Sequence, residues 1–446
     1  MNKQFSLFCR IVLSGTAAAV LASCGTSSVT PFDNLPKTTP AVSGAPLSAG
    51  VRTPAGAVHR PHGSPAAYQA VDFAAMPDWR KQNFTAALES FISGCAKLQY
   101  QHDWRDVCTR AVQTPRQNAA ARMFFEQYFT PWQVSENGKS DGTVTGYYEP
   151  VLHGDSKPSA RSRFPIYGIP ADFVSVPLPA RLRHSKSIVR VRQTGRNEGI
   201  IAADGTHIAD LSHFPINERS NALKGRFSGN RFVPYHTRNE IMGGALDGKA
   251  PVLGYADDPV ELFFLQIQGS GRLKTPDGRY IRLGFADKNE FPYVSIGRYM
   301  AERGYLPLAR TTMQGIKAYM KQNPHRLAEI LGQNPSFVFF RRLADNNDGP
   351  IGALGTPLTG GYAAAVDRRY ISLGAPLFVA TAHPETRRAL NRLLMAQDTG
   401  SAIKGAVRVD YFWGYGDEAG RVAGKMKHTG YVWQLLPNGV MPQYRP

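Results

Sequence analysis

The sequence predicts a mainly β fold with some helices. Its 446 residues include 43 Gly and 32 Pro, and hydrophobic residues make up 42% of the chain. Frequent turn residues combined with this apolar content are typical of globular proteins built from short strands. Apolar residues at helical spacing between residues 78 and 98 add a helical region. The length allows two ordinary domains, or one domain interrupted by another.

The first residues predict an export signal. Lys3 and Arg10 flank the start of an apolar stretch that is too short for a permanent membrane span. It ends in L-A-S-C-G at 21–25, the lipobox pattern of bacterial lipoproteins. We therefore expect residues 1–23 to be removed and Cys24 to be acylated, with an ordinary signal peptide as the alternative. Gly25, rather than Asp, after the cysteine favours the outer membrane, and no later segment is apolar enough to cross a bilayer.

Residues 24–63 predict a flexible tether. This stretch is dominated by Ser, Thr, Pro, Ala and Gly, and such a composition buries too little apolar surface to fold. Cys95 and Cys108 remain in the folded part, and an exported pair favours a disulfide. Two buried free thiols are the alternative. The 11 histidines show no metal-ligand spacing, so we expect neither a metal nor a cofactor.

The charge of the chain limits the class of partner. Its formal net charge is +18, but the basic residues are scattered and form neither a Lys/Arg tract nor a nucleic-acid-binding motif. We therefore expect no nucleic acid. A polymer or surface that carries carboxylates or phosphates explains the charge better, and a merely solvated basic exterior is the alternative.

Helices and polar strand ends follow the tether. Apolar periodicity predicts one helix over 78–98, with Asp78 near its cap, and a second over 115–128. A strand over 143–150 ends in Tyr147 and Tyr148. Paired tyrosines at a strand end can stack on the apolar face of a pyranose, although they are more often part of a core and its rim.

Residues 151–294 predict short strands of a β-barrel or sandwich. Within them, Gln266, Gln268 and Ser270 alternate with apolar neighbours before a glycine turn. These polar side chains are candidates for reading the hydroxyl and N-acetyl groups of a glycan, with a satisfied polar ladder on a sheet as the alternative. Helices over 293–303 and 311–331, the second interrupted near Pro324, precede a buried strand at 335–340.

The region 395–417 carries the most informative acids. Asp398 opens a glycine-containing turn, and residues 406–413 alternate as a strand. That alternation places Arg408, Asp410 and Phe412 on one face. An acid among β-formers and aromatic residues is uncommon unless it has a partner or a task. Asp410 is therefore a candidate functional acid, and an ion pair with Arg408 or Lys404 is the structural alternative.

Six ordered motifs resemble the membrane-bound lytic murein transglycosylase A family, whose last part is a three-aspartate ("3D") domain. The motifs are G-Y-Y-E-P at 146–150, Q-I-Q-G-S-G at 266–271, N-P-S-F-V-F-F at 334–340, A-V-D-R-R-Y-I at 365–371, D-T-G-S-A-I-K-G at 398–405 and V-D-Y-F-W-G-Y-G at 409–416. The resemblance implies a discontinuous double-psi β-barrel formed by 64–150 and 341–446, with its 3D region at about 343–440. It also implies a smaller inserted domain, 151–340, which contains a β-barrel and binds substrate, and a groove between the two.

The resemblance implies cleavage of the β-1,4 bond between N-acetylmuramic acid and N-acetylglucosamine in peptidoglycan, with 1,6-anhydromuramyl products. Asp410 would act first as acid and then as base, and Asp398 would be a second acid in the site. Arg408, on the same face, would oppose protonation of Asp410, so we expect Arg408 to turn toward Asp417 or Glu418. The expected substrate-binding residues are Tyr147, Tyr148, Gln266, Gln268, Ser270, Asp367, Thr399 and Lys404.

These inferences place the protein at the periplasmic face of the outer membrane, held there by its lipid. The expected partners are peptidoglycan glycan strands, together with proteins of cell-wall synthesis or division. Two other functions stay open: a hydrolase on the same barrel, with Asp398 or Asp417 as base, and a non-catalytic lipoprotein that binds the cell wall.

Overall fold

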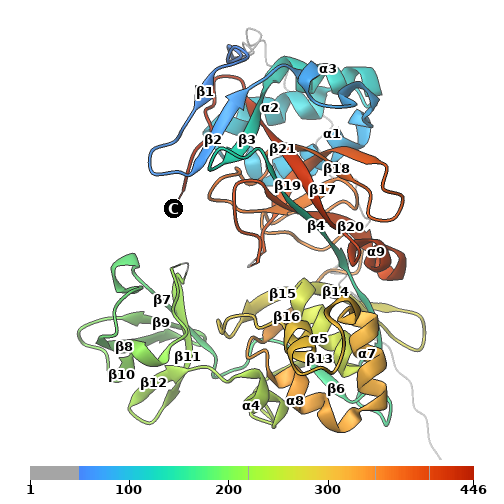
Figure 1. The fold of residues 1–446 in the computed structure, drawn as a ribbon. Coiled ribbons are helices and arrows are strands. Elements are labelled where there is room, and N and C mark those ends of the chain that lie inside the picture. Colours follow the sequence, from blue (N-terminus) through green and yellow to red (C-terminus); the bar gives the residue numbers. More distant parts are fainter. Residues whose placement is uncertain (1–49, 219, 347, 401, 446) are drawn as a thin grey trace, which may run out of the picture. The chain divides into compact units, whose positions relative to one another are not determined.

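A computed structural model describes residues 50–445, apart from 219, 347 and 401. The predicted signal peptide, Cys24 and most of the predicted tether lie outside the described residues. The mainly β fold with some helices that the sequence predicts is confirmed (Figure 1). Folded structure begins earlier than expected, because Val58–His59 (β1) pairs with Ala66–Ala70 (β2) although it lies within the stretch predicted as a tether.

The largest sheet has nine strands in the order β1-β2-β3-β21-β18-β19-β17-β20-β4, and β21 also pairs with β4. Strands β21, β18, β19, β17, β20 and β4 therefore pair in a closed circuit, as a barrel requires. The circuit joins one strand from the first third of the chain to five from its end, in agreement with the predicted double-psi β-barrel. The bounds are β3 Phe129–Glu136, β4 Asp141–Glu149, β17 Ala363–Val366, β18 Pro376–Ala382, β19 Ala389–Asp398, β20 Arg408–Tyr415 and β21 Lys427–Pro437.

Three helices pack on this sheet: α1 Phe84–Leu98, α2 His102–Gln113 and α3 Asn118–Tyr128. The helix predicted from residue 78 starts six residues later, because Asp78 has a φ of 55° and the side chain of Asn83 caps α1. Helix α2 was not predicted. Its first two turns lie between the two cysteines in the sequence. Phe91 at the centre of α1 is 1% exposed and packs against aromatic rings of α2 and α3.

The structure contains the disulfide between Cys95 in α1 and Cys108 in α2. The two cysteines are 13 residues apart in the sequence, and a loop of that size constrains the unfolded chain by about 3 kcal/mol. We expect Cys95→Ser combined with Cys108→Ser to lower the free energy of unfolding by roughly that amount. Urea titration of the oxidised protein, the reduced protein and the double variant measures the effect. Equal midpoints for the oxidised and reduced forms would contradict it.

The segment between β4 and β17 contains a closed six-stranded barrel and a second, six-stranded sheet. The barrel, in the order β10-β12-β11-β7-β9-β8, surrounds a small apolar core that includes Val176, Val191 and Leu223. The sheet has the order β16-β15-β14-β5-β13-β6. Bounds are β5 Val151–Asp155, β6 Phe164–Tyr167, β7 Val174–Pro177, β8 Ile188–Gly195, β9 Glu198–Ile201, β10 His207–Asp210, β11 Ala222–Ser228, β12 Arg231–Pro234, β13 Val252–Ala256, β14 Ser270–Lys274, β15 Tyr280–Lys288 and β16 Val338–Arg342.

The helices of this segment are α4 Arg238–Met242, α5 Pro259–Gln268, α6 Ile296–Glu302, α7 Met313–Gln322 and α8 Leu327–Gly332. Helix α5 packs on the second sheet and shares an apolar cluster with α6, α7 and α8. The pair of helices predicted from 293 to 331 thus forms, with its break near Pro324. The strand-like interpretation of residues 260–271 was wrong up to Gln268, because these residues form α5, whereas Ser270 and Gly271 begin strand β14. Asp258 accepts hydrogen bonds from the Val260 and Glu261 amides, Pro259 occupies the first turn and Gly269 ends the helix with a φ of 79°.

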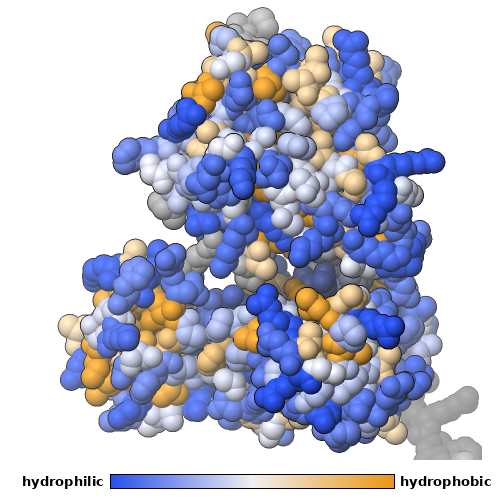
Figure 2. Space-filling view, viewed as in Figure 1, coloured by the Kyte–Doolittle hydropathy of each residue, from blue (hydrophilic) through white to orange (hydrophobic). Residues whose placement is uncertain are grey.

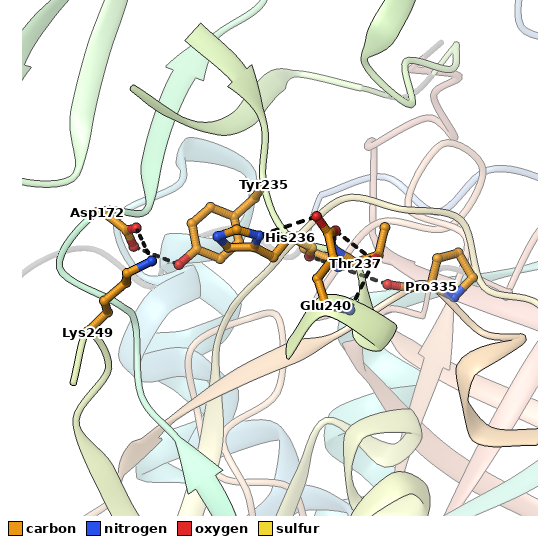
Figure 3. A network of polar contacts seen from close by, with 8 residues as sticks. Asp172, Tyr235, His236, Thr237, Glu240, Lys249 and Pro335 are labelled. Carbon is orange, nitrogen blue, oxygen red and sulfur yellow. Dashed lines mark hydrogen bonds and ion pairs between the residues drawn. The ribbon is translucent and has the colours of Figure 1, made fainter. Parts of the chain in front are cut away.

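A polar network fixes the start of α4 (Figure 3). Thr237 and Glu240 form a capping box, in which each side chain accepts the backbone N–H of the other residue. Next to it, the Tyr235 hydroxyl donates to Asp172 at 2.7 Å, and His236 lies 3.6 Å from Glu240. These contacts are internal to the segment between β4 and β17, and they position no residue of the predicted site.

The surface is largely polar. Figure 2 shows hydrophilic residues over most of the visible face, with hydrophobic residues in smaller patches between them. Among the described residues, no helix combines the length and the hydropathy that a bilayer crossing needs.

Candidate active site

Four neighbouring strands of the barrel bring the two predicted catalytic acids into one row. Ala365 of β17 pairs with Asp398 of β19 on one side and with Asp410 of β20 on the other. Asp410 in turn pairs with Thr145 of β4. Because directly paired residues project their side chains to the same face of a sheet, the two carboxylates and the Thr145 hydroxyl share a face. Ala365 thus lies between the two acids in this row.

Asp410 is partly exposed and makes one strong contact. The Thr145 hydroxyl donates to its Oδ1 at 2.6 Å, and within the described part of the chain its Oδ2 has no hydrogen-bond partner. Burial raises the pKa of Asp410, and the negative charge of Asp398 adds to this, while Thr145 and Arg408 lower it by smaller amounts. The net pKa is above the ordinary aspartate value. Asp410 therefore has a free oxygen and a raised proton affinity, as a general acid requires.

Arg408 does not form the ion pair that the structural alternative requires. Its Nη1 donates to the backbone carbonyls of Val409, at 2.6 Å, and Thr143, at 3.3 Å. The expectation that it turns toward Asp417 or Glu418 was wrong in its choice of partner. The guanidinium is occupied by main-chain oxygens of its own strand and of β4. Arg408 lowers the pKa of Asp410 through its positive charge, without a hydrogen bond to the carboxyl.

Asp398 has both of its oxygens occupied. The Tyr147 hydroxyl donates to Oδ2 at 3.0 Å, and the Ala353 amide donates to Oδ1 at 2.9 Å. Burial raises the pKa of Asp398, and the hydrogen bonds from the Thr399 and Ala353 amides and from Tyr147 reduce this effect. Asp398 is thus a fixed, hydrogen-bonded acid, while Asp410 keeps an oxygen available to a substrate.

The hydrogen bond from the Thr145 hydroxyl lowers the pKa of Asp410, and a valine of nearly the same shape removes it. We expect Thr145→Val to raise the pKa of Asp410, because the hydroxyl stabilises only the ionised carboxyl. The acid form would then persist to higher pH, so the alkaline limb of the pH–activity profile should move upward. The measurement is kcat/KM against pH for both proteins, with Thr143→Val, in the same strand, as control. A downward shift of that limb would contradict the assignment.

The third aspartate of the 3D motif has different contacts. Asp367 is 5% exposed, forms an ion pair with Arg369 at 2.7 Å and accepts the Gly405 amide at 3.0 Å. Burial opposes its ionisation, but the hydrogen bonds from Arg369 and the Gly405 and Arg369 amides outweigh burial and lower its pKa. These contacts tie the loop after β17 to the loop before β20. A role of Asp367 in binding substrate stays a prediction.

Of the other predicted binding residues, Tyr147 and Thr399 lie next to Asp398, and the rest lie elsewhere in the structure. Tyr147 lies in the site: its ring is 5.1 Å from that of Phe412, and its hydroxyl binds Asp398. Tyr148 packs its ring against Gly420, while its amide donates to Gln268 at 3.3 Å. Both tyrosines are partly exposed, and a role of either ring in sugar stacking stays a prediction. The remaining residues are Gln266, which is buried in α5, Ser270 at the start of β14, Thr399 beside Asp398, and Lys404, which is exposed.

Sequence reasoning missed Thr145 and the Ala353 amide. Thr145 is two residues before Tyr147, so the alternation of β4 places the two on one face. That signal was present, but Thr145 is 265 residues from Asp410, and only strand pairing joins them. A backbone donor such as the Ala353 amide has no signature in the sequence.

The comparisons with known proteins agree with this architecture. Residues 143–200 and 204–341 match the MltA specific insert domain, and residues 362–436 match the 3D domain. The crystal structure of MltA from Neisseria gonorrhoeae is 67% identical and superposes with a TM-score of 0.83, covering 91% of this chain and 99% of that one.

Two further proteins are more distant. The lytic transglycosylase LtgG of Burkholderia pseudomallei is 37% identical, with a TM-score of 0.54, over 88% of this chain and all of that one. Membrane-bound lytic murein transglycosylase A of Vibrio cholerae is 34% identical over 236 residues, which is 51% of this chain and 62% of that protein. The chain thus spans less than two thirds of this curated relative in sequence, but almost the whole Neisseria structure. On these matches, the chain belongs to the MltA family.

Proposed function

We propose that this protein is a lytic transglycosylase that cleaves the β-1,4 bond between N-acetylmuramic acid and N-acetylglucosamine in peptidoglycan. The observation that carries the proposal is the row of Asp398, Ala365, Asp410 and Thr145 across four barrel strands. It holds one partly exposed acid with a raised pKa beside a second, fixed acid. Membership of a family whose curated relatives are named lytic murein transglycosylases supports the choice of substrate.

Asp410 performs both proton transfers. Its protonated carboxyl donates to the glycosidic oxygen as the bond from C1 of the muramyl residue to that oxygen breaks. The resulting carboxylate then takes the proton of the C6 hydroxyl of the same muramyl residue, and the C6 oxygen bonds to C1. The products are a free 4-hydroxyl on N-acetylglucosamine and a 1,6-anhydromuramyl end. Asp410 is again protonated, and no water is consumed.

One acid is sufficient because the nucleophile belongs to the substrate. Ordinary glycoside hydrolases use two carboxyl groups, one as acid and one as nucleophile or base. Here the C6 hydroxyl is held next to C1, so its effective concentration replaces an activated water molecule. The ionised form of Asp398, held by Tyr147 and the Ala353 amide, favours the positive charge that develops at C1.

The rest of the chain brings this site to the cell wall. We assign residues 1–23 to a signal peptide, Cys24 to lipid attachment and the following segment, up to about Ala57, to a tether at the periplasmic face of the outer membrane. Residues 151–340 form the inserted substrate-binding domain, and 64–150 with 341–446 form the catalytic barrel. The net charge of +18 favours binding to the carboxylates of peptide stems and to anionic lipid.

Product analysis tests the proposal. Purified protein is incubated with isolated sacculi, and the released muropeptides are analysed by mass spectrometry. Anhydromuramyl ends, 18 mass units lighter than reducing ends, are the expected result. Reducing ends would instead indicate a hydrolase. Binding to sacculi without release of soluble fragments would indicate a non-catalytic wall-binding lipoprotein.

A further inference from the structure

Beyond Asp410, strand β20 changes its course. Its register against β4 shifts between Phe412 and Tyr415. Phe412 and Tyr415 are three residues apart, but their partners Tyr147 and Glu149 are only two apart, so β20 has a bulge here. Gly414, in the middle of this bulge, has a φ of 105°, which a residue with a side chain rarely adopts. Bulges bend a strand and re-aim the side chain that follows. Here the residue that follows is Tyr415.

Tyr415 is an exposed aromatic ring on a buried support. It is 61% exposed, and the guanidinium of Arg272 lies 4.3 Å from its ring centroid. Arg272 itself is 7% exposed, pairs with Glu149 at 3.0 Å and donates to the Asp348 carbonyl at 3.0 Å. Because Glu149 and the Asp348 carbonyl fix the guanidinium, it supports one side of the ring, and the rest of the ring remains open to solvent.

The ring borders a cavity of about 380 Å³. This volume is within the range of small-ligand sites. Phe412, Gly414 and Tyr415 of β20 line it, together with Glu149 and Arg272. Glu149 is 1% exposed, and its Oε1 has no hydrogen-bond partner in the described part of the protein. The cavity thus combines an aromatic face with a cation and an unfilled acceptor.

The cavity adjoins the catalytic row. Phe412, in its wall, packs against Tyr147, which binds Asp398. Glu149 is four residues beyond Thr145 on β4, or about 13 Å at the usual rise of a strand. That separation is longer than a single sugar ring. A ligand in the cavity is therefore a part of the glycan that does not react.

We propose that Tyr415 and this cavity form a distal sugar-binding subsite, in which a pyranose of the glycan stacks on the Tyr415 ring. The inference rests on the proposed function and adds a determinant of chain length to it. The open ring face suits the apolar C–H face of a pyranose. Arg272 and Glu149 supply a donor and an acceptor for ring hydroxyl or N-acetyl groups.

The test compares substrates that reach the subsite with substrates that do not. Peptide-free glycan strands, obtained by amidase digestion and separated by length, serve as substrates for the wild-type protein and for Tyr415→Ala. We expect KM for long strands to rise about tenfold, with little change in kcat, and the kinetics of the shortest cleavable strands to remain as in the wild type. Tyr415→Phe keeps the ring face and should behave as the wild type. Tyr100→Ala, which removes a tyrosine that is 78% exposed near the disulfide, is the control.

The possible failures can be told apart. If Tyr415→Ala loses activity on short and long strands alike, the ring is not a distal subsite. An effect seen only on strands that carry peptide stems would assign the cavity to peptide and overturn the proposal. If the wild-type protein forms no anhydro products from any strand, the proposed function fails instead. Binding of chitin oligosaccharides of increasing length to Asp410→Asn then tests the subsite on its own, and an affinity independent of Tyr415 would overturn it.

Discussion

Replacing Asp410 with asparagine should abolish the release of anhydromuropeptides from sacculi while leaving the fold intact. Asparagine has nearly the same shape and can still accept the Thr145 hydrogen bond, but it cannot donate and then accept a proton. General acid–base catalysis contributes about 10²–10⁴-fold to a rate, and this residue performs both transfers. We therefore expect a loss of at least about 10³-fold in kcat, measured by chromatography of the soluble products.

Asp398→Asn is the matched control, since it removes the other acid of the row. Its hydrogen bonds from Tyr147 and the Ala353 amide position it without leaving an oxygen free for proton transfer. We expect a smaller loss and a lowered pKa of Asp410, because the nearby negative charge is gone. The alkaline limb of the pH–activity profile should then move down. Full activity in Asp410→Asn would remove the central assignment.

Replacing Asp410 with asparagine should also change the stability of the protein. The raised pKa of Asp410 means that the folded protein holds this proton to higher pH than the unfolded chain. Stability is therefore lost as the pH rises through the folded-state pKa, and a neutral asparagine avoids the loss. Asp410→Asn should have a higher Tm than the wild type at pH 8, with a smaller difference at pH 4. Active sites commonly carry such a cost.

The secondary structure was predictable where one pattern dominated. Apolar residues at helical spacing located α1 and α3, and strict alternation located β20. The error at residues 260–268 arose because Gln266, Gln268 and Ser270 are two apart, as in a strand. The Asp258-Pro259 start and the Gly269 stop, which are helix boundary signals, outweigh that spacing. The residues at the two ends of the segment therefore specify a helix, and the sequence already contained these signals.

The candidate site was predictable in its residue types but not in its geometry. Asp398 and Asp410 are close in sequence, yet they meet because each pairs with Ala365 of a third strand, one parallel and one antiparallel. No local pattern specifies that arrangement. The same holds for Arg408, whose partners are main-chain carbonyls that every sequence contains. The resemblance implied the roles of the two acids. The strand register places them in one row, and their hydrogen-bond partners account for the difference between them.

The buried ion pair beneath Tyr415 should be essential to stability. The side chains of Arg272 and Glu149 are 8% and 0% exposed and 3.0 Å apart. Arg272→Met leaves the Glu149 carboxylate buried without its cation, a change that typically costs about 3–5 kcal/mol. We expect a loss of that size in the free energy of unfolding at pH 8, measured by urea denaturation. The double variant Arg272→Met with Glu149→Leu should recover much of it, because an apolar pair of similar volume removes the unpaired charge.

The pH dependence of the stability of Arg272→Met distinguishes the effect of the unpaired Glu149 charge from a loss of packing. Burial raises the pKa of Glu149, and Arg272 opposes that shift. Without Arg272 the pKa rises further, so at pH 4 the carboxyl is protonated and its burial costs less. Stability is then lost as the pH rises through the folded-state pKa, and Arg272→Met should be destabilised less at pH 4 than at pH 8. An equal loss at both values would mean that Arg272 acts through its contacts with Tyr415 and the Asp348 carbonyl, not through its charge.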